Sequence, residues 1–194
     1  GMDLADVRYN AITWTHRATR GWSYGGGIID PRSGEIIKGY VNLGSQRVRQ
    51  DLLIAEGLLA AHALDADPAL RQQALDMALA RLRQLAAHEV GHALGFAHNF
   101  AASRTGNGSV LDYPHPIITL DGEGRVQLAQ PYGVGVGDWD KFVVAHGYGE
   151  FAANDELAAL AKLRHDIAAR GYRYVSDADA RAPGDAHPEG LLWD

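Results

Sequence analysis

The sequence of 194 residues predicts an α+β fold, in which a small twisted mixed sheet packs on a long helix and a mainly helical C-terminal part follows. Three observations support this prediction. Residues 7–43 contain β-branched and aromatic runs separated by turn signals, which are typical of strands. From Ser45 to Leu94 the apolar residues recur at helical spacing. Beyond residue 137, two further segments begin at capping residues and end at glycines, as short helices do.

Three strands are expected before residue 45. They are placed at residues 7–16, 22–29 and 35–43. The turn-forming residues 30–34 join the second and third strands into an antiparallel hairpin. The third strand is expected to place Ile37, Val41 and Leu43 on one face, because side chains alternate along a strand.

Two helices are expected next. The first runs from Ser45, a suitable N-cap, to about Leu64. The second has Asp67 as its N-cap and Pro68 at its first position, and it continues to Leu94. Met77 lies on the apolar stripe of this second helix and is expected to fill the core.

The C-terminal half is predicted to contain a small hairpin and two helices. The hairpin pairs residues 117–120 with residues 125–128. Asp138 is expected to cap a helix over residues 139–146, and Asn154 a helix over residues 155–170.

The long helix ends in the segment from His88 to His98, which reads H-E-x-x-H-x-x-G-x-x-H. His88 and His92 are four residues apart, so on a helix their Cβ atoms lie roughly 5–6 Å apart on one face, and both rings can bind one Zn²⁺. Glu89 is rotated by about 100° and can reach a zinc-bound water without binding the metal. His98 can join only if the chain turns, and Gly95 accepts the positive φ that such a turn requires. The segment therefore predicts one catalytic zinc with an open position for water.

A simpler interpretation of H-E-x-x-H is a solvated helix face. Gly95 and His98 stand at the spacing that a three-histidine site demands, and this favours zinc. The chain has no cysteine, so histidine and carboxylate are the ligands it offers.

Composition limits the other function classes. Hydrophobic residues make up 46% and charged residues 22% of the chain, which is ordinary for one globular domain. A net charge of −6 argues against binding to nucleic acid or an anionic membrane. No apolar run approaches the ~20 residues that a membrane span needs, and no secretory signal follows Met2. The oligomeric state is not indicated.

The segment from His88 to His98 resembles the signature of the metzincin zinc peptidases. The wider resemblance, over about residues 7–194, is to a bacterial group of large zinc-dependent metzincin-like proteases. It rests on residues 30–36, 47–51, 87–99, 109–116 and 137–141. The resemblance implies a zincin-like fold and a single catalytic domain over residues 1–194. Its sheet and active-site helix would span about residues 7–98, and its C-terminal subdomain about residues 99–194.

The same resemblance implies a peptide or protein substrate and a periplasmic or secreted location. In that group the catalytic domain follows a long N-terminal region and a secretion signal. It also begins with a strand and a helix that we do not find before Val7. The resemblance therefore implies that this chain is a catalytic-domain fragment or a minimal version.

Ser109 to Tyr113 resembles the methionine-containing turn of metzincins, S-x-M-x-Y, with Leu111 at the methionine position. Leucine is close to methionine in volume, so the turn is expected to keep its packing role. Tyr113 matches a tyrosine that contacts the metal or the oxyanion in some family members; packing beneath the turn is the alternative.

Residues 22–29 resemble the edge strand along which metzincins bind their peptide substrate. Gly25, Gly26, Gly27 and Ile28 are therefore candidate substrate-binding residues. The alternative is a sheet edge that glycines merely protect from unwanted pairing.

Together these residues predict a zinc-dependent endopeptidase in which Glu89 acts as general base, and Asp112 is a candidate to orient the histidines. Two alternatives remain. One is a non-catalytic zinc-containing module that binds peptides, and the other is a zinc hydrolase that acts on other substrates.

Overall fold

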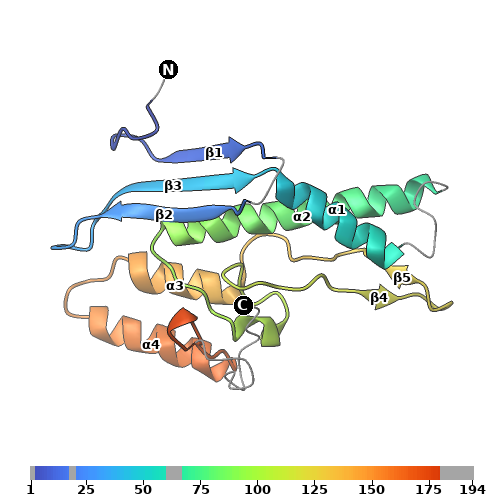
Figure 1. The fold of residues 1–194 in the computed structure, drawn as a ribbon. Coiled ribbons are helices and arrows are strands. Elements are labelled where there is room, and N and C mark those ends of the chain that lie inside the picture. Colours follow the sequence, from blue (N-terminus) through green and yellow to red (C-terminus); the bar gives the residue numbers. More distant parts are fainter. Residues whose placement is uncertain (1–2, 18–20, 60–66, 180–194) are drawn as a thin grey trace. The chain divides into compact units, whose positions relative to one another are not determined.

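The computed structural model describes residues 3–17, 21–59 and 67–179. Contacts divide the chain into two compact units. Unit 1 consists of Gly1–Gly95 and His115–Gly135, and unit 2 of Phe96–Pro114 and Val136–Asp194. Helices and strands occur together, so the fold is α+β as predicted (Figure 1).

Unit 1 contains a three-stranded mixed sheet in the order β1-β3-β2. Its strands are β1 (Ala11–Thr15), β2 (Tyr24–Ile29) and β3 (Ile36–Gly44). β1 is parallel to β3, whereas β2 is antiparallel to it, which confirms the predicted hairpin. The turn between β2 and β3 places Gly34 at φ +79°. β1 is shorter than the predicted strand 7–16, because Asp6 instead folds the preceding residues into a turn through its bond to the Arg8 backbone N–H.

The predicted apolar face of β3 is buried only in part. Val41 is buried, but Ile37 is 45% exposed, whereas Lys38 on the opposite face is only 3% exposed. Lys38 can be buried because its ammonium donates hydrogen bonds to the backbone carbonyls of Asp6 and Tyr9. A buried charge of this kind needs such partners, and they come from the N-terminal turns.

Helices α1 (Gln46–Leu59) and α2 (Pro68–Ala93) pack against each other in unit 1 (Figure 1). The Asp67 side chain accepts a hydrogen bond from the Ala69 backbone N–H at 2.8 Å, which confirms the predicted N-cap. Their shared core includes Met77 as predicted; the buried residues are Ala55, Leu59, Ala74, Met77, Leu128 and Tyr132. The end of the first helix, expected near Leu64, lies outside the described residues.

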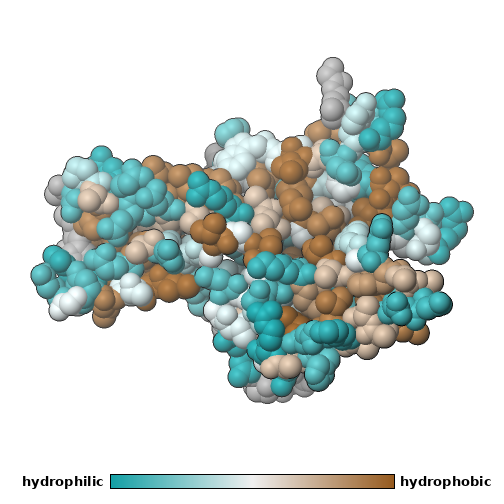
Figure 2. Space-filling view, turned by 180° about the vertical axis from the view of Figure 1, so that it is seen from behind, coloured by the Kyte–Doolittle hydropathy of each residue, from teal (hydrophilic) through white to brown (hydrophobic). Residues whose placement is uncertain are grey.

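α2 also packs against β2 and β3. Ile12 and Trp14 of β1 pair with Val41 and Leu43 of β3, so their side chains lie on the same face of the sheet as those two residues. α2 covers this face at β2 and β3. Both remain exposed. In the space-filling view, brown hydrophobic side chains likewise reach the surface among teal polar ones (Figure 2). The predicted small hairpin is present as β4 (Thr119–Leu120) and β5 (Val126–Gln127).

Unit 2 contains helices α3 (Asp138–Tyr148) and α4 (Glu156–Ala169) and the short 3₁₀ helices η2 (Ala102–Thr105) and η3 (Asp177–Asp179). Both predicted helices are present, but their caps differ. The N-cap of α3 is Gly137, and that of α4 is Asp155.

The start of α3 differs from the prediction because Asp138 is its first residue, and the side chain that bonds to the N-cap backbone is that of Asp140 at the third helical position. Asp140 accepts a hydrogen bond from the Gly137 backbone N–H at 2.6 Å. Asp138 instead pairs with Arg170 at the end of α4. α3 also continues past residue 146, where the helix was expected to end, and its C-cap is Gly149.

Candidate active site

The last two turns of α2 carry His88 and His92 on one face. Their Nε2 atoms lie 3.0 Å apart, and the rings meet edge to face with centroids 4.6 Å apart. This is the contact expected of residues four apart on a helix. His88 is buried and His92 is half-buried.

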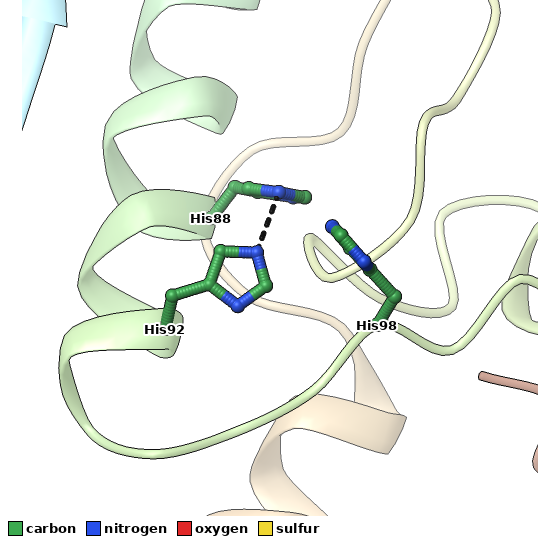
Figure 3. Close-up of side chains that lie close together, drawn as sticks. All are labelled: His88, His92 and His98. Atoms are coloured by element: carbon green, nitrogen blue, oxygen red, sulfur yellow. Dashed lines mark hydrogen bonds between the residues drawn. The ribbon is translucent and has the colours of Figure 1, made fainter. Parts of the chain in front are cut away.

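The chain turns immediately after these histidines. α2 ends at Ala93, and Gly95 adopts φ +86° while its N–H donates to the His92 carbonyl at 2.9 Å. A side chain at this φ would be strained, which is why the position suits glycine. One ring atom from each of His88, His92 and His98 lies within 4.8 Å of the others (Figure 3). All three come from eleven consecutive residues, so the local path of the chain brings them together.

Glu89 is only 5% exposed and follows His88 on α2. Its carboxylate accepts a hydrogen bond from the backbone N–H of Gly25 on β2. Burial raises the pKa of Glu89 to about 7, while this hydrogen bond and the charge of Arg81 act in the opposite direction. The close approach requires glycine, because a Cβ on Gly25 would lie 1.9 Å from the Glu89 backbone oxygen.

His98 has its own surroundings in unit 2. Its ring stacks on Phe100, with centroids 5.1 Å apart, and contacts the Tyr113 ring at 4.9 Å. Its Nδ1 lies 2.8 Å from Oδ2 of Asp177. Asp177 is not among the residues predicted from the sequence, and no local signal points to it, because 79 residues separate it from His98.

The carboxylate at His98 is thus Asp177, whereas Asp112 has other partners. Asp112 accepts hydrogen bonds from the Ser103 backbone N–H at 2.8 Å and from the Tyr113 backbone N–H at 2.7 Å. The Ser103 hydroxyl donates to it as well. Asp112 therefore holds the turn that contains Leu111 and Tyr113.

Leu111, at the position that resembles the family methionine, is 1% exposed. Its carbonyl accepts a hydrogen bond from the Asn99 backbone N–H at 2.7 Å, directly after His98. Asp140 secures the same turn, because its carboxylate accepts from the Ser109 hydroxyl and the Val110 backbone N–H. The turn is therefore fixed beside the third histidine.

Gly25, Gly26, Gly27 and Ile28 lie on β2, at one edge of the described sheet. A Cβ on Gly26 would lie 3.0 Å from the Tyr40 hydroxyl, and one on Gly27 would lie 3.1 Å from the Ile36 side chain. Ile28 is exposed. Because β2 is an edge strand, one side of its backbone has no neighbouring strand among the described residues. Gly25 on this strand contacts Glu89.

No helix of the described residues has the length and apolar character needed to cross a membrane. Searches of the curated proteins and of the solved structures gave no match. A family model with the description Met-zincin matches residues 71–194, which include the three histidines, Glu89 and the Leu111 turn. Because this match covers more than half of the sequence, the chain belongs to the Met-zincin family.

Proposed function

We propose that this protein is a zinc-dependent endopeptidase, in which His88, His92 and His98 bind one catalytic Zn²⁺. The observation that carries the proposal is the cluster of three histidine ring atoms within 4.8 Å, formed in a chain that belongs to the Met-zincin family. Three protein ligands leave one coordination position open, as in catalytic rather than structural zinc sites.

The histidines fit zinc in spacing and chemistry. With Zn–N distances of about 2.0–2.1 Å, two ligands of a tetrahedral site are separated by roughly 3.3 Å. The Nε2 atoms of His88 and His92 lie 3.0 Å apart, so little movement is needed. When bound, Zn²⁺ would supply Lewis acidity and lower the pKa of a coordinated water to about 7.

Glu89 is proposed to be the general base. Its carboxylate would take a proton from the attacking water and later give it to the leaving amine nitrogen. A pKa near 7 suits both transfers, because the group then gains and loses a proton with similar ease. The hydrogen bond from Gly25 holds the carboxylate at the edge of the sheet.

Tyr113 is proposed to assist by donating a hydrogen bond from its hydroxyl to the carbonyl oxygen of the scissile bond. Its contact with the His98 ring supports a place beside the metal ligands. Its hydroxyl would then stabilise the charge that develops on that oxygen.

The substrate is proposed to be an extended peptide that pairs with β2 along Gly25 to Ile28. The Gly25 N–H donates to Glu89, so the proposed general base contacts this strand. A peptide bound along the edge of β2 that has no neighbouring strand among the described residues would pass the general base. The family resemblance further supports a periplasmic or secreted location, where such a peptidase meets protein substrates.

Replacement of Glu89 tests the proposal. We expect Glu89→Gln to keep about one zinc per chain but to cleave an unfolded protein substrate at least ~10²-fold more slowly. Glu56→Gln, on the exposed face of α1, is the matched control and should cleave normally. Zinc content by elemental analysis and cleavage by mass spectrometry give the two readouts. Undiminished cleavage by Glu89→Gln would refute the mechanism. Zinc and peptide binding without cleavage by the unaltered chain would favour the non-catalytic module instead.

A further inference from the structure

We propose that Asp177 is a positioning residue that orients His98 toward the metal, an inference that rests on the proposed zinc site. The Asp177 carboxylate oxygen lies 2.8 Å from Nδ1 of His98. A carboxylate that accepts the Nδ1 proton leaves Nε2 as the unprotonated nitrogen, which is the form that can bind a metal.

His98 needs such a partner more than the other two histidines do. His88 and His92 project from a regular helix, whereas His98 follows the turn at Gly95 and lies on a loop. Phe100 and Tyr113 restrict the plane of its ring through their stacking contacts. Stacking does not select which ring nitrogen carries the proton, and Asp177 makes that selection. In Figure 3, one ring nitrogen of His98 is directed toward His88 and His92.

The segment that carries Asp177 is held against the residues that follow His98. The Phe100 N–H donates to the Val175 carbonyl at 2.7 Å, and the Val175 N–H donates to the Asn99 side chain at 3.1 Å. Val175 is itself buried against Phe100. The η3 turn is closed by a 2.9 Å hydrogen bond from the Ser176 N–H to Asp179. These contacts place Asp177 next to His98 independently of any metal.

Zinc affinity of the full chain is the first test, measured by competition with a chelator of known affinity. Loss of the partner of a metal-binding histidine typically weakens binding roughly 10- to 100-fold. Because the Asp177 side chain is 63% exposed, we expect Asp177→Ala to weaken zinc binding by roughly 10-fold, at the lower end of this range.

Two further variants separate positioning from folding. Asp177→Asn keeps a side-chain oxygen that can accept the Nδ1 proton, so it should restore most of the affinity. Asp179→Asn is the control in the same turn, where it keeps the bond to Ser176 and should bind zinc normally. Equal zinc affinity in Asp177→Ala and the unaltered chain would overturn the proposal, as would equal losses in Asp177→Ala and Asp179→Asn.

A second measurement does not require zinc at all. Nitrogen-15 NMR of the metal-free chain at pH 8 reports which ring nitrogen of His98 is protonated. We expect protonated Nδ1 in the unaltered chain and in Asp177→Asn, and a mixture of both forms in Asp177→Ala. If the chain bound no zinc but showed this pattern, the zinc proposal would fail and the Asp177–His98 contact would stand. An unprotonated Nδ1 in the unaltered chain would refute the role of Asp177 directly.

Discussion

Gly25 is a position where β2 and α2 approach closely, so Gly25→Ala is a sharp perturbation. An added Cβ would lie 1.9 Å from the Glu89 carbonyl oxygen and 2.6 Å from its carbonyl carbon. Both are backbone atoms that cannot rotate away. Non-bonded contacts are favourable at roughly 3.5 Å, so β2 and α2 would have to separate locally by about 1.5 Å.

The cost has two parts. Overpacking of a tight contact destabilises by about 1–3 kcal/mol. Separation also breaks the hydrogen bond from the Gly25 N–H to the Glu89 carboxylate, and a hydrogen bond to a charged group contributes about 1.5–3 kcal/mol. Because the two parts overlap, we expect a total loss of about 3 kcal/mol. For a chain of this length that loss lowers the Tm by about 6–12 °C.

Thermal and urea unfolding of the metal-free chain measure this loss. Gly39→Ala is the matched control, because Gly39 also faces α2 but its added Cβ would meet Ala93 at an ordinary 3.5 Å. We expect Gly39→Ala to stay within about 1 kcal/mol of the unaltered chain. A Gly25→Ala variant as stable as Gly39→Ala would refute the close contact between β2 and Glu89.

Three other predictions follow from buried groups. The pKa of Glu89 rises from 4.5 to about 7 on folding, so its stabilising contribution is complete below pH 4.5 and is lost as the pH rises through 7. The free energy of unfolding of the metal-free protein should therefore fall by up to about 3 kcal/mol over this range relative to that of Glu89→Gln, as measured by urea unfolding. Parallel pH profiles of the two proteins would contradict this. Asp51 is fully buried, and its carboxylate lies 3.0 Å from the Arg47 guanidinium. Asp51→Ala should therefore lower the free energy of unfolding by about 3 kcal/mol. Asp76→Ala, at an exposed position, should lower it by less than about 0.5 kcal/mol. Leu111→Met should lower the free energy of unfolding by less than about 1.5 kcal/mol, and Leu111→Ala by about 2–5 kcal/mol. Equal losses in the two variants would show that stability does not depend on the volume filled at residue 111.

The candidate metal centre could be predicted from the sequence because its geometry is local. His88 and His92 are placed by the period of one helix, and Gly95 permits the reversal that returns His98. The long helix, its Asp67 cap and the hairpin of β2 and β3 follow from equally short-range signals. These features need only a few neighbouring residues, so the sequence carries them directly.

The partners of these residues were decided by the tertiary structure. Asp177 contacts His98 across 79 residues, and Gly25 on the sheet bonds to Glu89 on α2. The Asp140 carboxylate accepts hydrogen bonds from the N-cap backbone of α3 and from Val110 in the Leu111 turn. The packing of unit 2 brings these two segments together at Asp140 rather than at Asp138. No helical or strand period links such pairs. Only the folded chain brings them within hydrogen-bonding distance, and burial in the folded chain raises the pKa of Glu89.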